Sequence, residues 1–197
     1  MSCQPDTGIR SVLPHTNASA QTDSYSVVIA YDEVAGGQRA MEMFIRLQRE
    51  TPGAQDFHCD LWRFDLLTLP GVSDAAVLAG MQAKIIIIAA RAEIDLPGPV
   101  KSWLSQSTAG KLPGSAALVA LLHSRREWLD TVSPSHATIE MAARRRGLQF
   151  FAQEGRKAGG DVSQVITGLR DMKTRVSSGL EKVRPNPPRP AHWGINE

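Results

Sequence analysis

Acidic, basic and hydroxyl side chains follow several apolar segments of this chain, at the points where buried strands are expected to end. These candidate site residues are Asp32, Glu33, Asp65, Arg91, Glu93 and Ser124. Two or three carboxylate oxygens, completed by water, suffice to bind a divalent cation, so an acidic pocket is one interpretation. The simpler one is that Asp32 and Glu33 stabilise the positive end of the helix that follows them. The residue types leave the metal question open.

The chain offers no recognisable set of catalytic side chains. Its five histidines are scattered and form no group with metal-ligand spacing. Ser124 follows His123, but the glycine-flanked serine of a hydrolase nucleophile elbow is missing. We therefore predict no catalytic residue from the residue types alone.

An unbroken isoleucine run, Ile85 to Ile88, is the clearest structural signal. Short β-branched runs of this kind are typical of strands buried on both faces of a parallel sheet. Further strands are expected at 25–31, 57–67, 116–122 and 148–152, each separated from the next by a helical pattern. Strict alternation predicts an α/β fold with right-handed crossovers. Five strands fit a parallel, doubly wound, flavodoxin-like three-layer sandwich with strand order 2-1-3-4-5, whose ligands bind at the carboxyl ends of the strands.

Helix boundaries follow from capping and breaking residues. A turn over 32–37 is expected before the first helix, and Ser73 or Asp74 is expected to cap the second. A third helix is predicted over 98–106, with prolines in its first turn. Ser135 is expected to cap a helix over 136–146. The arginine triplet 144–146 ends that helix; an anion site is possible there, but positive charge at a solvated helix end explains it more simply.

Composition indicates an ordinary globular protein. The chain has 197 residues, a formal net charge of +2, and 42% hydrophobic and 21% charged residues. So small a net charge gives no reason to expect binding to nucleic acid or to an anionic membrane. Two cysteines without a disulfide framework, no signal-peptide pattern and no apolar stretch of membrane-spanning length predict a cytoplasmic protein.

Three regions are expected along the chain. Residues 1–24 are polar and read as a disordered leader, 25–154 as the flavodoxin-like domain, and 155–197 as a C-terminal helix with a proline-rich tail. The last helix carries an apolar stripe, which predicts that it packs on the domain or on a second copy. Trp193 and Ile195 in the tail are candidate docking residues for a protein partner or for self-association.

The residues around the expected strand ends resemble those of receiver domains. Tyr31-Asp32-Glu33 resembles the acidic pair that closes their first strand, and Ser124 the hydroxyl residue that ends their fourth. Ala89-Ala90-Arg91 stands where that resemblance would require the phosphoacceptor aspartate. The resemblance therefore implies a pseudo-receiver without acyl-phosphate chemistry.

A second resemblance is to NAD(P)H-dependent flavin reductases. It covers residues 85–103, including the run Leu-Pro-Gly-Pro-Val-Lys-Ser-Trp. It implies a flavin mononucleotide (FMN) site at the carboxyl ends of the strands. However, the first loop, Asp32-Glu33-Val34-Ala35-Gly36-Gly37, places two carboxylates where the flavin phosphate of those enzymes lies. Uncompensated carboxylates would repel a phosphate, which argues against tight FMN binding.

A third resemblance spans most of the chain after residue 25, including its ending His-Trp-Gly-Ile-Asn-Glu, and is to a group of uncharacterised bacterial proteins. It implies the fold and no activity. Taken together, the sequence favours a non-catalytic regulatory or protein-interaction module resembling a pseudo-receiver, with no cofactor. The alternative is a flavin-dependent NAD(P)H reductase with an atypical phosphate loop. The loop after the first strand is the feature that separates the two hypotheses.

Overall fold

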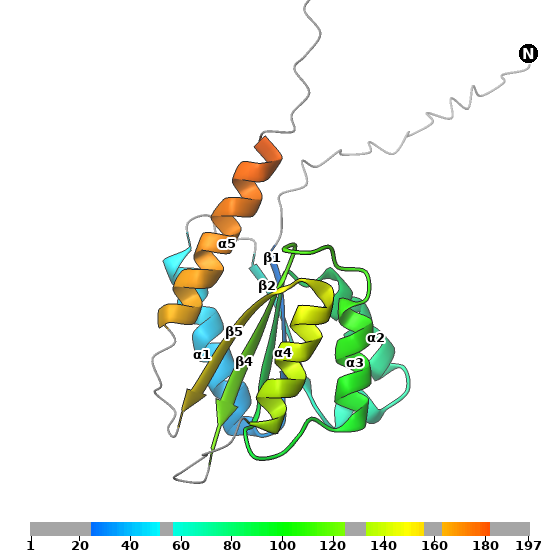
Figure 1. Cartoon of the computed structure of the whole chain (residues 1–197). Coiled ribbons are helices and arrows are strands. Elements are labelled where there is room, and N and C mark those ends of the chain that lie inside the picture. The colour runs from blue at the N-terminus through cyan, green and yellow to red at the C-terminus, as the bar shows by residue number, and fades with distance from the viewer. Residues whose placement is uncertain (1–24, 52–56, 125–132, 156–162, 182–197) are drawn as a thin grey trace, which may run out of the picture.

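A computed structural model describes residues 25–51, 57–124, 133–155 and 163–181, with side chains described as far as residue 172. The expected leader, Trp193 and Ile195 lie outside the described residues. Five parallel strands form one sheet in the order β2-β1-β3-β4-β5. The strands are β1 (Tyr25–Tyr31), β2 (Phe57–Arg63), β3 (Ile85–Arg91), β4 (Ala117–His123) and β5 (Gln149–Gly155). The predicted α/β flavodoxin-like topology is therefore confirmed (Figure 1).

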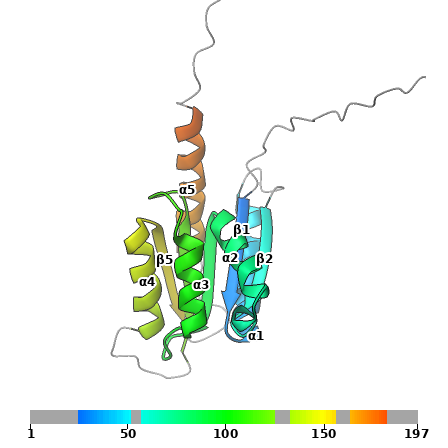
Figure 2. The same cartoon turned by 90° about the vertical axis from the view of Figure 1, so that its right-hand side faces the viewer.

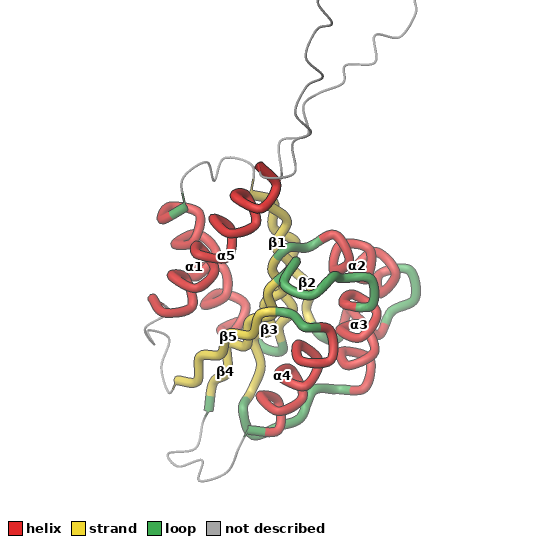
Figure 3. Tube along the Cα trace, turned by 45° about the horizontal axis from the view of Figure 1, so that its top comes forward, coloured by secondary structure: helices red, strands yellow, loops and turns green. Residues whose placement is uncertain are grey.

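Helices cover both faces of the sheet, as Figure 2 and the tube in Figure 3 show. The helices are α1 (Val34–Glu50), α2 (Val72–Gln82), α3 (Gly98–Thr108), α4 (Pro134–Arg146) and α5 (Ser163–Glu181), with a short 3-10 helix, η2 (Leu66–Thr68). Helices α1 and α5 lie on one face, and α2, α3 and α4 lie on the other. Among the described helices, none is both long and apolar enough to cross a membrane.

The isoleucine run sits at the centre of both apolar layers. Ile85 and Ile87 belong to the layer under α1 and α5, whereas Ile86 and Ile88 belong to the layer under α2, α3 and α4. All four are at most 1% exposed, because β3 lies between β1 and β4 and both of its faces are covered. Alternation of side chains along a strand accounts for this division.

Helix α5 packs onto the sheet beside α1. Val165, Ile166, Leu169 and Met172 of the predicted stripe are buried in the same layer as the α1 side chains. Gly168 allows the close approach, because a Cβ at this position would lie 2.9 Å from Cζ of Phe151 on β5. The side chains of the other two residues of the predicted stripe, Val162 and Val176, lie outside the described ones.

Several element boundaries differ from the sequence predictions. Helix α1 begins at Val34, so the two glycines assigned to a turn belong to its first turn. A Cβ at Gly37 would lie 2.9 Å from the Tyr31 ring, which explains glycine there by close packing. Strand β2 ends at Arg63 and η2 follows, where a strand to residue 67 was predicted. The N-cap of α2 is Gly71, with a φ of 79°, which glycine adopts readily.

Candidate functional site

The carboxyl ends of β1 and β3 are joined by the side chain of Asp32. One carboxylate oxygen of Asp32 accepts a hydrogen bond from the Glu33 amide at 2.6 Å, and the other accepts one from the Arg91 amide at 2.9 Å. The Asp32 amide in turn donates to the Ala89 carbonyl at 3.1 Å. Asp32 therefore ties the two central strands together at the switch point of the sheet, where ligands of this topology bind.

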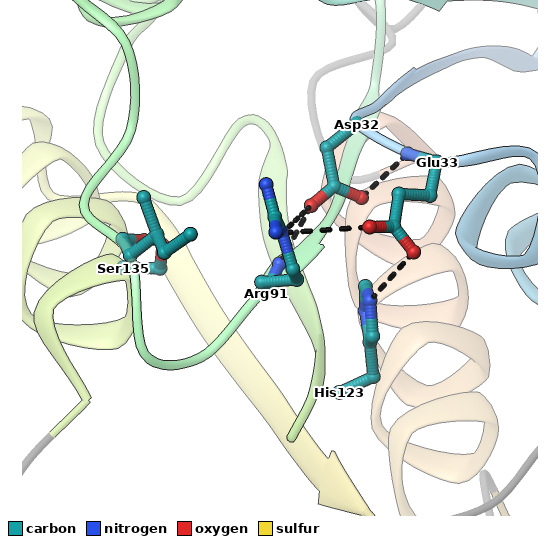
Figure 4. A network of polar contacts seen from close by, with 6 residues as sticks. Asp32, Glu33, Arg91, His123 and Ser135 are labelled. Carbon is teal, nitrogen blue, oxygen red and sulfur yellow. Dashed lines mark hydrogen bonds and ion pairs between the residues drawn. The ribbon is translucent and has the colours of Figure 1, made fainter. Parts of the chain in front are cut away.

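Arg91 lies between the two carboxylates that follow β1. Its Nε is 3.6 Å from Oδ2 of Asp32 and 3.6 Å from Oε1 of Glu33. The other Glu33 oxygen is 3.7 Å from Nε2 of His123, at the end of β4. Figure 4 shows the resulting chain of charges, Asp32–Arg91–Glu33–His123, which we call the rim cluster. The acidic pair is thus compensated by one guanidinium and faces one imidazole.

Some nitrogen atoms of the rim cluster make no hydrogen bond with a described residue. Nε of Arg91 and both ring nitrogens of His123 are buried and have no hydrogen-bond partner among the described residues. Their ion-pair distances of 3.6 and 3.7 Å exceed the normal hydrogen-bond range. A buried donor without an acceptor is costly, so Nε of Arg91 suits an anionic or carbonyl oxygen brought by a ligand.

The remaining sequence candidates are Glu93, Ser124 and Asp65. Ser124 donates a short hydrogen bond to Glu93, which links the ends of β4 and β3 as a second pair. Asp65 is exposed and bonds Arg63, and this hydrogen bond holds the pKa of the Asp65 carboxyl below its usual value. The structure therefore brings together Asp32, Glu33 and Arg91, pairs Glu93 with Ser124, and leaves Asp65 apart.

Serines fix the loop after β3 to the start of α4. Ser133 accepts from the His136 amide at 3.2 Å and donates to the Ala92 carbonyl at 2.7 Å. Ser133 is therefore the N-cap of α4, and the prediction of Ser135 was wrong. Pro134 occupies the first helical position, so the cap is the residue before it, Ser133. Ser135 lies inside the first turn of α4 and donates to the Ile94 carbonyl at 2.5 Å.

Asp95 and His123 are site residues that sequence reasoning missed. Asp95 accepts from Lys101 at 2.5 Å and from Thr138 at 2.8 Å, so it joins the first turn of α3 to α4. The hydrogen bond from Lys101 is the main reason why the pKa of Asp95 is lowered. His123 could have been found from its position as the last residue of a strand beside Ser124. The partners of Asp95 are 6 and 43 residues away, and no local pattern indicates them.

A small cavity adjoins the rim cluster. It has a volume of about 50 Å³, and its lining includes Asp32, Arg91, Phe64 and Leu96. Small-molecule sites usually enclose roughly 300 to 1,000 Å³. Within the described part of the chain, no group of three or more histidine, cysteine, aspartate or glutamate residues could hold a metal ion. The geometry is that of a charged rim beside a shallow recess, and the cation interpretation gains no support from it.

Comparison with known proteins identifies the fold. No protein-family model matches the chain, and no curated protein matches it by sequence. A short-chain flavodoxin associated with a PDU bacterial microcompartment matches with a TM-score of 0.53 and 8% identity, over 78% of this chain and 98% of that one. The Flv1 flavodiiron core from Synechocystis matches with a TM-score of 0.51 and 11% identity, over 82% of this chain and 37% of that one.

A weaker likeness is to general stress protein 14 from Treponema denticola, solved in complex with FMN. Its TM-score is 0.42 at 9% identity, over 80% of this chain and 98% of that one. At these identities the two matches with TM-scores above 0.5 show a flavodoxin-like fold. The resemblance to a group of uncharacterised bacterial proteins stays unconfirmed, because no family model matches.

Two sequence predictions are corrected by these findings. The non-catalytic pseudo-receiver module is contradicted, because the matched structures are flavodoxins and related proteins, which favour the flavin-dependent alternative. The prediction of no cofactor is contradicted by the same flavodoxin match. The charge argument against FMN was incomplete, because Asp32 and Glu33 are compensated in part. Arg91 stands between them, and two backbone amides bind Asp32.

Proposed function

We propose that this protein is a flavin-dependent reductase that holds FMN at the carboxyl ends of β1 and β3, with a reduced nicotinamide as hydride donor. The observation that carries the proposal is Arg91, whose buried Nε lies beside the start of α1 and has no hydrogen-bond partner in the described part of the chain. A bound flavin would supply the hydride and electron transfer that no side chain here can perform. The protein's own residues would bind and orient it.

The phosphate end of FMN fits the start of α1. Glu33 is the N-cap of this helix, and no side-chain hydrogen bond closes that end. The first amides of a helix have no partner within the helix, and the helix dipole favours an anion there. Arg91 adds a guanidinium, which suits phosphate geometry better than an ammonium does. A phosphate here would therefore be bound by amides and Arg91 where related loops use hydroxyl groups.

Asp32 opposes this binding and makes the loop atypical. Its Oδ1 would lie 3.5 Å from a Cβ built on Gly36, so the carboxylate faces the first turn of α1. Like charges about 4 Å apart cost roughly 4 kcal/mol at an effective dielectric of 20, and less where water screens them. We therefore expect weaker phosphate binding than a hydroxyl-lined loop would give.

The described residues provide less for the flavin ring. The recess beside Phe64 and Leu96 has a volume of about 50 Å³, too small for an isoalloxazine. Support for the proposal therefore comes from the fold, the start of α1 and Arg91. The phosphate is the part of the cofactor that the experiment should test.

The test compares FMN with riboflavin, which lacks the phosphate, by quenching of flavin fluorescence. We expect saturable FMN binding, weaker riboflavin binding, and a loss of about tenfold in FMN affinity for Arg91→Met, as for one charge-assisted contact. Asp32→Asn should strengthen FMN binding because it removes the charge, but the gain should be small, since the amide oxygen can accept only one of the two backbone hydrogen bonds that the carboxylate accepts.

Arg144→Gln is the matched control, because Arg144 bonds Glu140 at 2.8 Å on the outer side of α4. It should leave FMN affinity within about twofold of wild type, as a distant exposed charge would. Equal affinity for FMN and riboflavin, or equal losses in the two arginine variants, would refute phosphate binding at the rim cluster.

A further inference from the structure

A groove separates α3 from α4 on the face of the sheet opposite α1. Its volume is about 350 Å³, within the range of small-molecule sites. Both helices lie on this face, side by side (Figure 2). The α3–α4 groove is distinct from the rim cluster, because it contains none of the cluster's four residues.

The α3 wall is a single stripe of that helix. Its residues follow the i, i+3, i+4, i+7 spacing of one helix face: Lys101, Leu104, Ser105 and Thr108. Leu104 is 1% exposed and forms an apolar floor. Ser105 lies at the middle of the wall and is exposed, and its hydroxyl group makes no hydrogen bond with a described residue. This wall combines an apolar base with an available hydroxyl group.

The α4 wall repeats the same spacing with Thr138, Met141, Ala142 and Arg145. Met141 is 49% exposed although it is large and apolar, and its flexible side chain can adapt to a bound apolar group. Ala142 faces the middle of the groove, where its small side chain leaves room. The residues from 138 to 145 span about 10 Å along the helix axis, which suits a small molecule.

The charges in the groove are positive, and one of them is unpaired. Among the described residues, no carboxylate lines the groove. Lys101 is already bound by Asp95 at 2.5 Å, and Arg146 donates to the Ala109 carbonyl at 3.4 Å. Arg145 makes no hydrogen bond or ion pair with any described residue. An acid group could therefore bind at the Arg145 end without displacing an existing partner.

We propose that the α3–α4 groove binds a small organic anion with an apolar body. Its acid group lies at Arg145, and its apolar body covers Met141 and contacts Leu104. The proposal is independent of flavin binding, because the two sites share no residue. An ordinary solvated helix end explains the charge of Arg145, but it explains neither the enclosed volume nor the exposed Met141 beside it.

The probe is 1-anilinonaphthalene-8-sulfonate, whose fluorescence rises in apolar surroundings. Its matched partner is N-phenyl-1-naphthylamine, the same ring system without the sulfonate. We expect saturable binding of the sulfonate at one site. Arg145→Gln should weaken it about tenfold, as expected for loss of one charge-assisted contact. The neutral partner should change by less than about twofold, because it has no acid group for Arg145 to bind.

Two further variants locate the site. Ser105→Phe fills the middle of the groove from an exposed position and should abolish binding of both probes. Arg144→Gln removes the same charge one residue away, outside the groove lining, and should leave both affinities unchanged. Thermal melting of each variant checks that it is folded. The proposal is overturned if the sulfonate does not saturate, if Ser105→Phe still binds it, or if the two arginine variants behave alike.

Discussion

A ligand site needs side chains held in fixed positions and space for the ligand. The rim cluster has the first property, and the α3–α4 groove has the second. At the rim, Asp32, Glu33 and Arg91 are held in place by one another, but the adjoining recess has only about 50 Å³. The groove has about 350 Å³ and Arg145, which has no partner among the described residues, and Asp95 joins its two walls through Lys101 and Thr138 at one end. A strongly cross-linked cluster positions charges precisely and leaves little room, whereas a gap between helices gives room with little positioning.

The two sides of α3 show how the groove arises. Towards α2 the helices are in close contact, because Gly80 of α2 packs on Ser107 of α3. Trp103 is 1% exposed in the same apolar layer. Towards α4 the groove stays open. One helix therefore has a closed side that contributes stability and an open side that is available to a ligand.

The largest expected effect tests this contrast through Gly80→Ala. A Cβ at Gly80 would lie 2.5 Å from the Ser107 Cβ, so the helices must separate. Overpacking of this kind costs about 1 to 3 kcal/mol, which exceeds the roughly 1 kcal/mol gained in helix propensity. We expect the free energy of unfolding, measured with urea, to fall by up to about 2 kcal/mol. Ser105→Phe on the open side should change it by less than about 0.5 kcal/mol. If the two variants are equally stable, α3 has no closed side.

The second prediction concerns Arg91→Met, which removes the cation shared by Asp32 and Glu33. Partly exposed ion pairs contribute up to about 1 kcal/mol, so the free energy of unfolding should fall by about that amount. Adding Glu33→Gln should restore part of it, because one of the two facing carboxylates is then neutral. Arg145→Met in the groove should have no measurable effect on stability. A double variant no more stable than Arg91→Met would show that the rim charges do not interact.

Asp95 lies between the rim cluster and the α3–α4 groove, and its lowered pKa predicts how stability changes at acidic pH. Its hydrogen bond from Lys101 lowers the pKa below the ordinary 3.8, so the folded state binds the proton less readily than the unfolded state. The stabilisation is present above pH 3.8 and is lost as the pH falls through the lowered pKa. Wild type should therefore lose more stability than Asp95→Asn when the pH is lowered from 6 to about 2.5. Parallel losses in urea titrations would exclude this role for Asp95.

The last prediction is for alkaline pH and concerns Lys111 on the closed side of α3. Lys111 donates to the Met81 carbonyl at 3.0 Å, and burial lowers its pKa from 10.5 to about 8. Between these two values the unfolded state holds more protons, so stability rises with pH across that window. Compared with Lys111→Met, wild type should gain stability from pH 8 to 10.5. Identical pH profiles would show that Lys111 titrates normally in the folded protein.

The fold could be predicted from the sequence because its signals are local. The isoleucine run indicates β3, and the apolar segment before Asp32 indicates β1, with the same bounds that the structure shows. Gly36 and Gly37 misled the prediction of a turn, because both lie in the first turn of α1. At Gly37 the reason for glycine is close packing, since a Cβ there would lie 2.9 Å from the Tyr31 ring. Glycine in a sequence does not tell these two causes apart.

The site was predictable in its residues and not in its contacts. Asp32, Glu33 and Arg91 follow from strand ends in a parallel sheet. That Arg91 stands between the carboxylates depends on β3 lying beside β1, and Arg91 is 59 residues from Asp32. The argument against a flavin phosphate required uncompensated charges, and only the tertiary structure shows the compensation. The groove could not be predicted, because it depends on the distance between two helices.

The most direct test of the account is a titration with FMN followed by amide chemical shifts in a nitrogen-15 spectrum. We predict saturable shifts at the start of α1, in Val34, Ala35 and Gly36, and at Arg91 and His123, with the amides of the α3–α4 groove unchanged. Riboflavin should shift the amides of the first turn much less, because it has no phosphate. If FMN causes no saturable shifts, or if its shifts fall in the groove and spare the rim cluster, the proposed flavin site is wrong.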